Sequence, residues 1–329
     1  MGAASRRRPT AMLSPQYFHC LLDELPLHLI PQAFARLWLK SSGQPLFLNP
    51  ECSLLPAGEV PRDLQNNRQL LEGFSLQSTV AWVRDPAIAS FHPFWLGPQL
   101  EAVVSRLHVG EPAPPSLPER QRLLLAAAGI LTPVDYARQR LADCSAIVSK
   151  AAGSFREKNY APLNGLIHPF HLAALRRYYR HAIRCGGIRL GDEQSPRRYV
   201  AHNEPVARYF HHNVAKAISA AVGEPIKPSY VYLASYLSGA ELKKHTDRQQ
   251  CELSVTLCLD FSPEPELATS WPIRLDTKEG TSTVYQALGD ALLYHGTEVP
   301  HYRDVLAEGH TSTSIFFHYV PEDFSGPLD

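Results

Sequence analysis

Histidines and one aspartate in the second half of the chain have the residue types and spacing of a metal-binding group. His245 and Asp247 lie two residues apart, and His295, His301 and His310 follow further along the chain. Two imidazoles and one carboxylate form the facial triad that binds ferrous iron on one face and leaves the other face open to small molecules and oxygen. The sequence therefore predicts a non-haem Fe(II) site that uses His245, Asp247 and a third, distant ligand.

Short β patterns around the pair are the elements that must position it. An apolar, β-rich run covers residues 251–260, and further strand patterns cover residues 271–275 and 289–294. Residues i and i+2 of a strand point to the same face, so one strand would deliver the nitrogen of His245 and the oxygen of Asp247 together. We expect the third ligand to come from a strand that the fold brings alongside.

The order of these elements carries the interpretation, because a chain with fifteen histidines can contain one His-x-Asp pair by chance. Tyr236–Gly239 precedes the pair, the β-rich run follows it, and Gly289–Tyr294 and His301 come next. This order resembles that of the 2-oxoglutarate- and Fe(II)-dependent dioxygenases, in particular their prolyl-hydroxylase-like branch, over roughly residues 226–321. The resemblance implies an α+β fold with a double-stranded β-helix (jelly-roll) core in the C-terminal half, buttressed by helices.

The resemblance also implies the reaction. Such enzymes use Fe(II), 2-oxoglutarate and O2 to hydroxylate an unactivated C–H bond of an amino acid, peptide or small metabolite, releasing succinate and CO2. Because Asp247 keeps the carboxylate ligand, hydroxylation is favoured over halogenation, while desaturation and cyclisation stay open. The family's spacing favours His301, seven residues after Tyr294, as the third ligand, with His295 and His310 as alternatives.

The residue that would bind the distal carboxylate of 2-oxoglutarate departs from the family's pattern. Relatives place an Arg or Lys roughly nine or ten residues after the distal histidine, where this chain has His310 and Thr311. We expect Arg303 to replace it, because Arg303 and His301 would point inward together on one strand. His310 is the second candidate for this anchor, and Tyr236 is a candidate hydrogen-bond donor to the co-substrate.

The chain changes character along its length, which predicts two parts. Residues 42–118 are irregular and proline-rich. Helical patterns are found at residues 14–41, 119–130, 133–152, 167–185 and 204–223. We expect a mainly helical or irregular N-terminal region over residues 1–150 and a catalytic domain over residues 151–329. The N-terminal region would serve substrate recognition, homodimerisation or packing against the β core.

The composition of the chain argues against a nucleic-acid partner and a membrane span, and it favours a cytoplasmic location. The 329 residues are 44% hydrophobic and 19% charged, with a formal net charge of zero, so no global basic field favours nucleic acid. No apolar run approaches the length of a membrane span, and residues 9–13 are too short and mixed for the core of a signal peptide. Six scattered cysteines without a C-x-x-C pair predict reduced thiols in a cytoplasmic protein.

Two alternatives from other classes compete with the oxygenase. A non-catalytic jelly-roll module for protein interaction would explain the missing base near His310, but not the presence of His245 and Asp247. A cupin-type metalloenzyme that does not use 2-oxoglutarate could have a similar fold. Cupins typically present a His-x-His pair, which makes this second alternative less favoured. Dependence of activity on 2-oxoglutarate separates the three.

Overall fold

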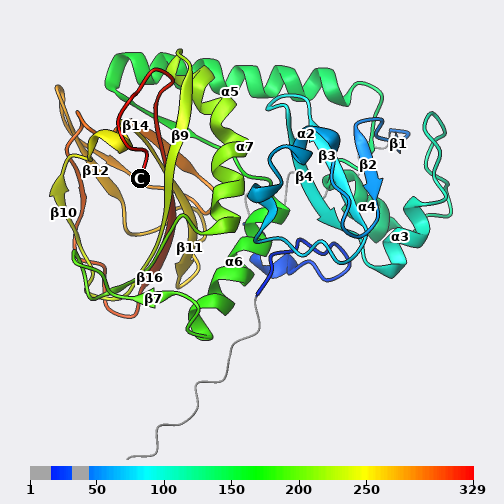
Figure 1. The fold of residues 1–329 in the computed structure, drawn as a ribbon, viewed down its shortest axis with the longest axis horizontal. Coiled ribbons are helices and arrows are strands. Elements are labelled where there is room, and N and C mark those ends of the chain that lie inside the picture. Colours follow the sequence, from blue (N-terminus) through cyan, green and yellow to red (C-terminus); the bar gives the residue numbers. More distant parts are fainter. Residues whose placement is uncertain (1–15, 32–43) are drawn as a thin grey trace, which may run out of the picture.

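The computed structural model describes residues 16–31 and 44–329. Figure 1 shows three layers along the long axis: a pair of β-sheets, a central layer of helices, and a smaller β-sheet at the far end. The segment 9–13 and much of the helix expected at residues 14–41 lie outside the described residues. Within residues 16–31 the chain forms a 3-10 turn at Leu27–Leu29 rather than an α-helix.

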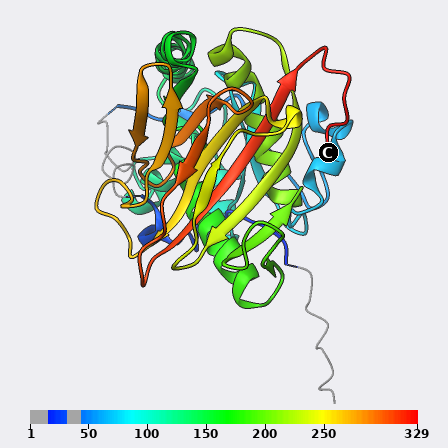
Figure 2. The same ribbon diagram turned by 90° about the vertical axis from the view of Figure 1, so that its left-hand side faces the viewer.

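Two antiparallel sheets form the core of the C-terminal half. The larger has seven strands in the order β6-β14-β11-β16-β9-β8-β7, and the smaller has four in the order β10-β15-β12-β13. Figure 2 shows β16 crossing the middle of the larger sheet. The strands are β6 Tyr160–Leu163, β7 Arg189–Leu190, β8 Arg198–His202, β9 Ile226–Tyr236, β10 Leu242–His245, β11 Leu253–Ser262, β12 Ile273–Thr277, β13 Gly280–Val284, β14 Ala291–His295, β15 His301–Arg303 and β16 Thr311–Pro321. This mixed α/β architecture with a large antiparallel sheet is consistent with the predicted jelly roll.

Alternating residues give the larger sheet two different faces. On β11, Leu253, Val255 and Leu257 belong to the main hydrophobic cluster, which also contains residues of the central helices. Because successive side chains of a strand point to opposite faces, Ser254 and Thr256 point away from the helices, into the space between the two sheets. The polar face of this strand is therefore the one available to a site.

The central helices pack on the apolar face of the larger sheet. They are α6 (Pro169–Arg184) and α7 (Pro205–Val222), which confirms the helices expected at residues 167–185 and 204–223. The carboxylate of Glu204 accepts a hydrogen bond from the Ala207 amide and so caps α7 at its beginning. Gly223, at a φ of 92°, ends α7 in the left-handed conformation that glycine adopts without steric cost.

The N-terminal part contains a β-sheet that the sequence did not lead us to expect. β2 (Cys52–Leu55), β3 (Val80–Asp85) and β4 (Ser90–Trp95) form an antiparallel sheet. The shorter elements around it are β1 Phe47–Leu48, α2 Arg62–Gln65, α3 Pro98–Val104, α4 Glu119–Ala127 and β5 Leu131–Thr132. A mainly helical N-terminal region is therefore not confirmed.

One hydrophobic cluster joins the N-terminal sheet to the rest of the molecule. It contains Trp82 and Phe94 together with Phe170 of α6 and Leu253 of the larger sheet. Helix α5 (Tyr136–Lys158) runs along one side of the molecule, from the N-terminal sheet to the sheets of the C-terminal half (Figure 1). It crosses the domain boundary expected at residue 150. The division into two domains stays a prediction.

Two further expectations concern the whole chain. The six cysteines, all within the described residues, are free. None of the helices in the described part of the chain has the length and apolar character that a membrane span needs.

Candidate metal centre

The two histidines are brought together by the pairing of β10 with β15. These strands are antiparallel neighbours, and His245 lies directly opposite His301 in their register. Asp247 does not share the strand of His245, which corrects the expectation from their i, i+2 spacing. Strand β10 ends at His245, and Asp247 lies in the loop that follows, where its amide donates a hydrogen bond to the Gly296 carbonyl at 2.8 Å.

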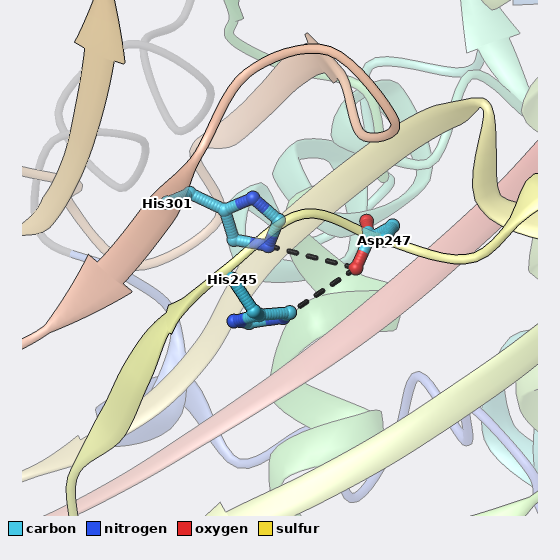
Figure 3. A group of neighbouring side chains, drawn as sticks. All are labelled: His245, Asp247 and His301. Atoms are coloured by element: carbon cyan, nitrogen blue, oxygen red, sulfur yellow. Dashed lines mark ion pairs between the residues drawn. The ribbon is translucent and has the colours of Figure 1, made fainter.

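Three ligand atoms converge on one point (Figure 3). The Nε2 atoms of His245 and His301 lie 3.5 and 3.6 Å from Oδ1 of Asp247. The two imidazole rings are 4.3 Å apart between centroids. Metal–nitrogen and metal–oxygen bonds are about 2.0–2.2 Å long, so one ion can bridge atoms at these separations. The donor set of two imidazole nitrogens and one carboxylate oxygen fits ferrous iron.

Hydrogen bonds to backbone carbonyls orient both imidazoles for metal binding. Nδ1 of His245 lies 2.7 Å from the Lys243 carbonyl, and Nδ1 of His301 lies 3.0 Å from the Val299 carbonyl. A carbonyl oxygen can only accept, so each Nδ1 carries the proton and each Nε2 keeps its lone pair. Metal-binding histidines almost always have such a partner on the other ring nitrogen.

The three groups differ in exposure and in pKa. The side chain of His301 is 3% exposed, that of Asp247 12% and that of His245 37%. The Asp247 carboxylate favours the protonated form of His245, whose Nε2–H would donate to it, and so raises the pKa of His245, whereas burial lowers the pKa of His301. Burial alone would raise the pKa of Asp247, but attraction to His245 and to the other nearby imidazoles in their protonated forms lowers it. The carboxylate is thus held ionised, as a metal ligand must be.

Arg303 lies on the same short strand as His301, with both side chains buried, as the sequence predicts. Its Nη1 donates to the Trp271 carbonyl at 2.5 Å, its Nη2 donates to Oε1 of Gln286 at 3.0 Å, and the guanidinium lies 4.9 Å from the Trp271 ring. Among residues 16–31 and 44–329, no carboxylate forms an ion pair with it. Burial lowers its pKa. Arg303 is therefore a buried cation without a described counter-charge.

Two tyrosines line the same interior. Tyr236 is buried, its ring lies 5.0 Å from that of Trp271, and its hydroxyl accepts a hydrogen bond from Arg198 at 3.4 Å. The hydroxyl of Tyr294 lies 3.5 Å from Nε2 of His301. In the sequence Tyr294 marked the end of a strand pattern and the spacing to His301, but the uniformly apolar Ala291–Tyr294 run gave no sign of which face its side chain would take.

The other two histidine candidates lie elsewhere. The ring of His295 stacks on Phe155 of α5 at 5.9 Å. His310 lies 5.7 Å from the Phe261 ring, and its Nδ1 donates to the Glu308 carbonyl at 2.9 Å. Within the described residues, neither is in a group of metal-ligand atoms with Asp247.

The chain was compared with known proteins. No family model and no curated protein sequence matches it. Similar solved structures include SnoN, a non-haem α-ketoglutarate-dependent epimerase from nogalamycin biosynthesis (13% identity, 54% of this chain and 83% of that chain, TM-score 0.46). A prolyl-4-hydroxylase from Pseudomonas putida is similar at 17% identity, over 52% of this chain and 98% of its own, with a TM-score of 0.43. HygX from Streptomyces hygroscopicus, with nickel, 2-oxoglutarate and hygromycin B bound, is similar at 14% identity (52% and 86% covered, TM-score 0.41). All three likenesses are remote.

Proposed function

We propose that this protein is an Fe(II)- and 2-oxoglutarate-dependent oxygenase that hydroxylates an unactivated C–H bond of an amino acid, a peptide or a small metabolite, releasing succinate and CO2. The observation that carries the proposal is the convergence of Nε2 of His245, Nε2 of His301 and Oδ1 of Asp247. A buried arginine, Arg303, lies two residues from one of the ligands.

The three residues would bind iron from one side and leave its other positions for 2-oxoglutarate and O2. When bound, ferrous iron with these two molecules supplies the oxidant that attacks the C–H bond. The part of the protein is to hold the ligands in place: the Lys243 and Val299 carbonyls fix the imidazole tautomers, and low exposure of His301 and Asp247 limits access of water. The more exposed His245 marks the side nearest to solvent.

Arg303 is the group that we assign to the distal carboxylate of 2-oxoglutarate. Moving a charged side chain out of water costs on the order of several kcal/mol unless an opposite charge compensates it. The described residues offer Arg303 only neutral partners, the Trp271 carbonyl and the Gln286 amide. An incoming carboxylate would supply the missing charge, and Tyr236, which packs against Trp271, would line the same space. His310, the second candidate, contacts none of these groups in the described structure.

The geometry also bears on the two alternatives. The best support for a non-catalytic module is the missing base near residue 310, and the buried guanidinium of Arg303 offers a replacement for it. A cupin-type enzyme without 2-oxoglutarate would leave that guanidinium without a ligand. Binding of 2-oxoglutarate to the iron-loaded protein would distinguish the oxygenase from both alternatives.

An anaerobic titration tests the proposal directly. Fe(II) and then 2-oxoglutarate are added to the purified protein, and the weak visible charge-transfer band of the chelate is recorded. We expect a band in the wild type that disappears in Asp247→Ala. Iron binding without a band would favour the cupin-type enzyme, and the absence of iron binding would favour the non-catalytic module.

We also propose a role for the N-terminal region, residues 1–150. Of the three roles considered for residues 1–150, the hydrophobic cluster shared with α6 and the larger sheet supports packing over substrate recognition or homodimerisation. Apart from α5, the described part of this region lies across the central helices from the metal centre (Figure 1). The cytoplasmic location and the lack of a nucleic-acid partner stay predictions from composition.

A further inference from the structure

The carboxylate oxygen of Asp247 that is not the one nearest to the two histidines accepts a hydrogen bond from a buried hydroxyl. Oδ2 of Asp247 lies 2.6 Å from Oγ of Ser254 on β11, while Oδ1 is the atom nearest to both imidazoles. Ser254 has no exposed surface. The two carboxylate oxygens therefore have different environments, one toward the metal position and one toward the larger sheet.

A histidine stands behind this serine. Nδ1 of His318 lies 2.9 Å from Oγ of Ser254, and the two residues are directly opposite each other on β16 and β11. The Asp247 carboxylate and the Cys251 carbonyl, 2.6 and 3.2 Å from Oγ of Ser254, can only accept, so the single hydroxyl proton of Ser254 goes to this side, mainly to the closer and charged Asp247. His318 must then donate its Nδ1 proton to the serine oxygen, and the bonds form one directed chain from His318 through Ser254 to Asp247.

Gly296 also packs closely against Asp247 and Ser254. The Gly296 carbonyl accepts the Asp247 amide proton at 2.8 Å. A Cβ atom on Gly296 would lie 2.5 Å from Oδ2 of Asp247 and 2.8 Å from Oγ of Ser254. These distances leave no room for a side chain, so the carboxylate, the serine and the loop fit together only with glycine there.

We propose that Ser254 and His318 are positioning residues that fix the Asp247 carboxylate with Oδ1 toward the metal. This inference rests on the proposed Fe(II) site. Asp247 comes from a loop, so the strand pairing that places His245 and His301 does not place it, and the Ser254–His318 chain supplies the missing constraint. Neither residue belongs to the ligand group of His245, Asp247 and His301. Loss of such outer partners of metal ligands typically weakens metal binding about 10- to 100-fold.

The test is an anaerobic Fe(II) titration of the metal-free protein, together with its melting temperature. Ser254→Ala should raise the dissociation constant for Fe(II) about 10- to 100-fold. His318→Leu should do the same, whereas His318→Asn, whose amide can present an N–H near the position of Nδ1, should restore most of the affinity. Ser235→Ala is the matched control, because Ser235 is also a buried serine of the larger sheet and its hydroxyl bonds only to Thr313 in the described structure.

The outcomes separate this inference from the proposed function. A wild-type protein that binds no Fe(II) removes both. If the wild type binds Fe(II) and Ser254→Ala binds it within threefold, the positioning role is wrong and the proposed function stands. An equal loss of affinity in Ser235→Ala, or equal losses in the Leu and Asn variants of His318, would likewise show that the hydrogen-bonded chain is not what orients Asp247.

Discussion

Replacing Arg303 with methionine should remove most of the affinity for 2-oxoglutarate and leave the metal-free fold intact. A guanidinium has five N–H donors, and in the described structure two of its hydrogen bonds go to the Trp271 carbonyl and to Gln286. The remaining donors are sufficient for the two parallel bonds of an arginine–carboxylate pair. Methionine keeps an unbranched side chain in the same space but has neither charge nor donors.

The magnitude follows from the burial of the guanidinium. Truncating one partner of a buried, hydrogen-bonded charge pair costs about 2–5 kcal/mol, so the dissociation constant for 2-oxoglutarate should rise between about thirtyfold and several thousandfold. The metal-free protein should lose much less stability. The same substitution removes a buried cation that has no acidic partner among the described residues, and this gain offsets the two lost hydrogen bonds.

The assay is a titration of the anaerobic, Fe(II)-loaded protein with 2-oxoglutarate, read at the charge-transfer band. Arg176→Met is the matched control. Arg176 is also buried but already has an acidic partner, because its Nη2 and Nε lie 2.9 and 3.0 Å from Oδ1 of Asp260. We expect the control to lower stability and to change the affinity for 2-oxoglutarate far less. An Arg303→Met protein that binds 2-oxoglutarate within threefold of the wild type would refute the assignment.

Four further changes have defined outcomes. His245→Ala should abolish Fe(II) binding in the same titration, and near wild-type binding would contradict the site. Gly296→Ala should weaken Fe(II) binding at least tenfold, because its Cβ would lie 2.5 Å from Oδ2 of Asp247. Burial lowers the pKa of His171 to about 3, so the folded state favours the neutral ring and stability should fall as the pH drops below about 6.5, by up to about 1.4 kcal/mol per pH unit. Urea unfolding at pH 7 and pH 5 measures this slope. It should be smaller in His171→Gln, while the buried His168, His211 and His318, whose pKa values burial also lowers, keep their share. Deleting residues 1–150 should give insoluble protein, because it uncovers the apolar face of the central helices; a soluble, folded fragment would show instead that the region is a separate domain.

The types of the metal-ligand residues could be predicted from the sequence, but their meeting point could not. His245 and His301 were candidates because imidazoles with a nearby carboxylate suit ferrous iron. Their register depends on pairing two short strands that are more than fifty residues apart, with β11 to β14 between them in the chain. A local pattern contains no information on which distant strand lies alongside. The choice of His301 among three histidines therefore depended on the residue spacing of the dioxygenase family that the sequence resembles.

The N-terminal β-sheet was missed because its strands are short apolar segments. Val80–Asp85 is buried along nearly its whole length, so it lacks the alternation that identifies a half-exposed strand, and a short apolar run cannot be told from a buried helix segment by periodicity. The helices at residues 169–184 and 205–222 were predicted well, because each has an apolar face, a proline in its first turn and a glycine within two residues of its end. Long amphipathic elements are therefore more predictable here than the sheet beside them.

The position of Asp247 in a loop was not predicted from the sequence, and it explains how the site holds this ligand. A ligand on a strand, such as His301, takes its orientation from the hydrogen-bonded ladder on both sides. A ligand on a loop has no ladder, and its orientation must come from contacts made one at a time. For Asp247 those contacts are the Gly296 carbonyl at its amide and the Ser254 hydroxyl at Oδ2. No metal-ligand spacing in the sequence marks either residue. Substitutions at Gly296 and Ser254 should therefore lower the affinity for metal more than they lower the stability of the fold. The sheet that carries Ser254 is stabilised by its own backbone hydrogen bonds and by the helices packed on its other face.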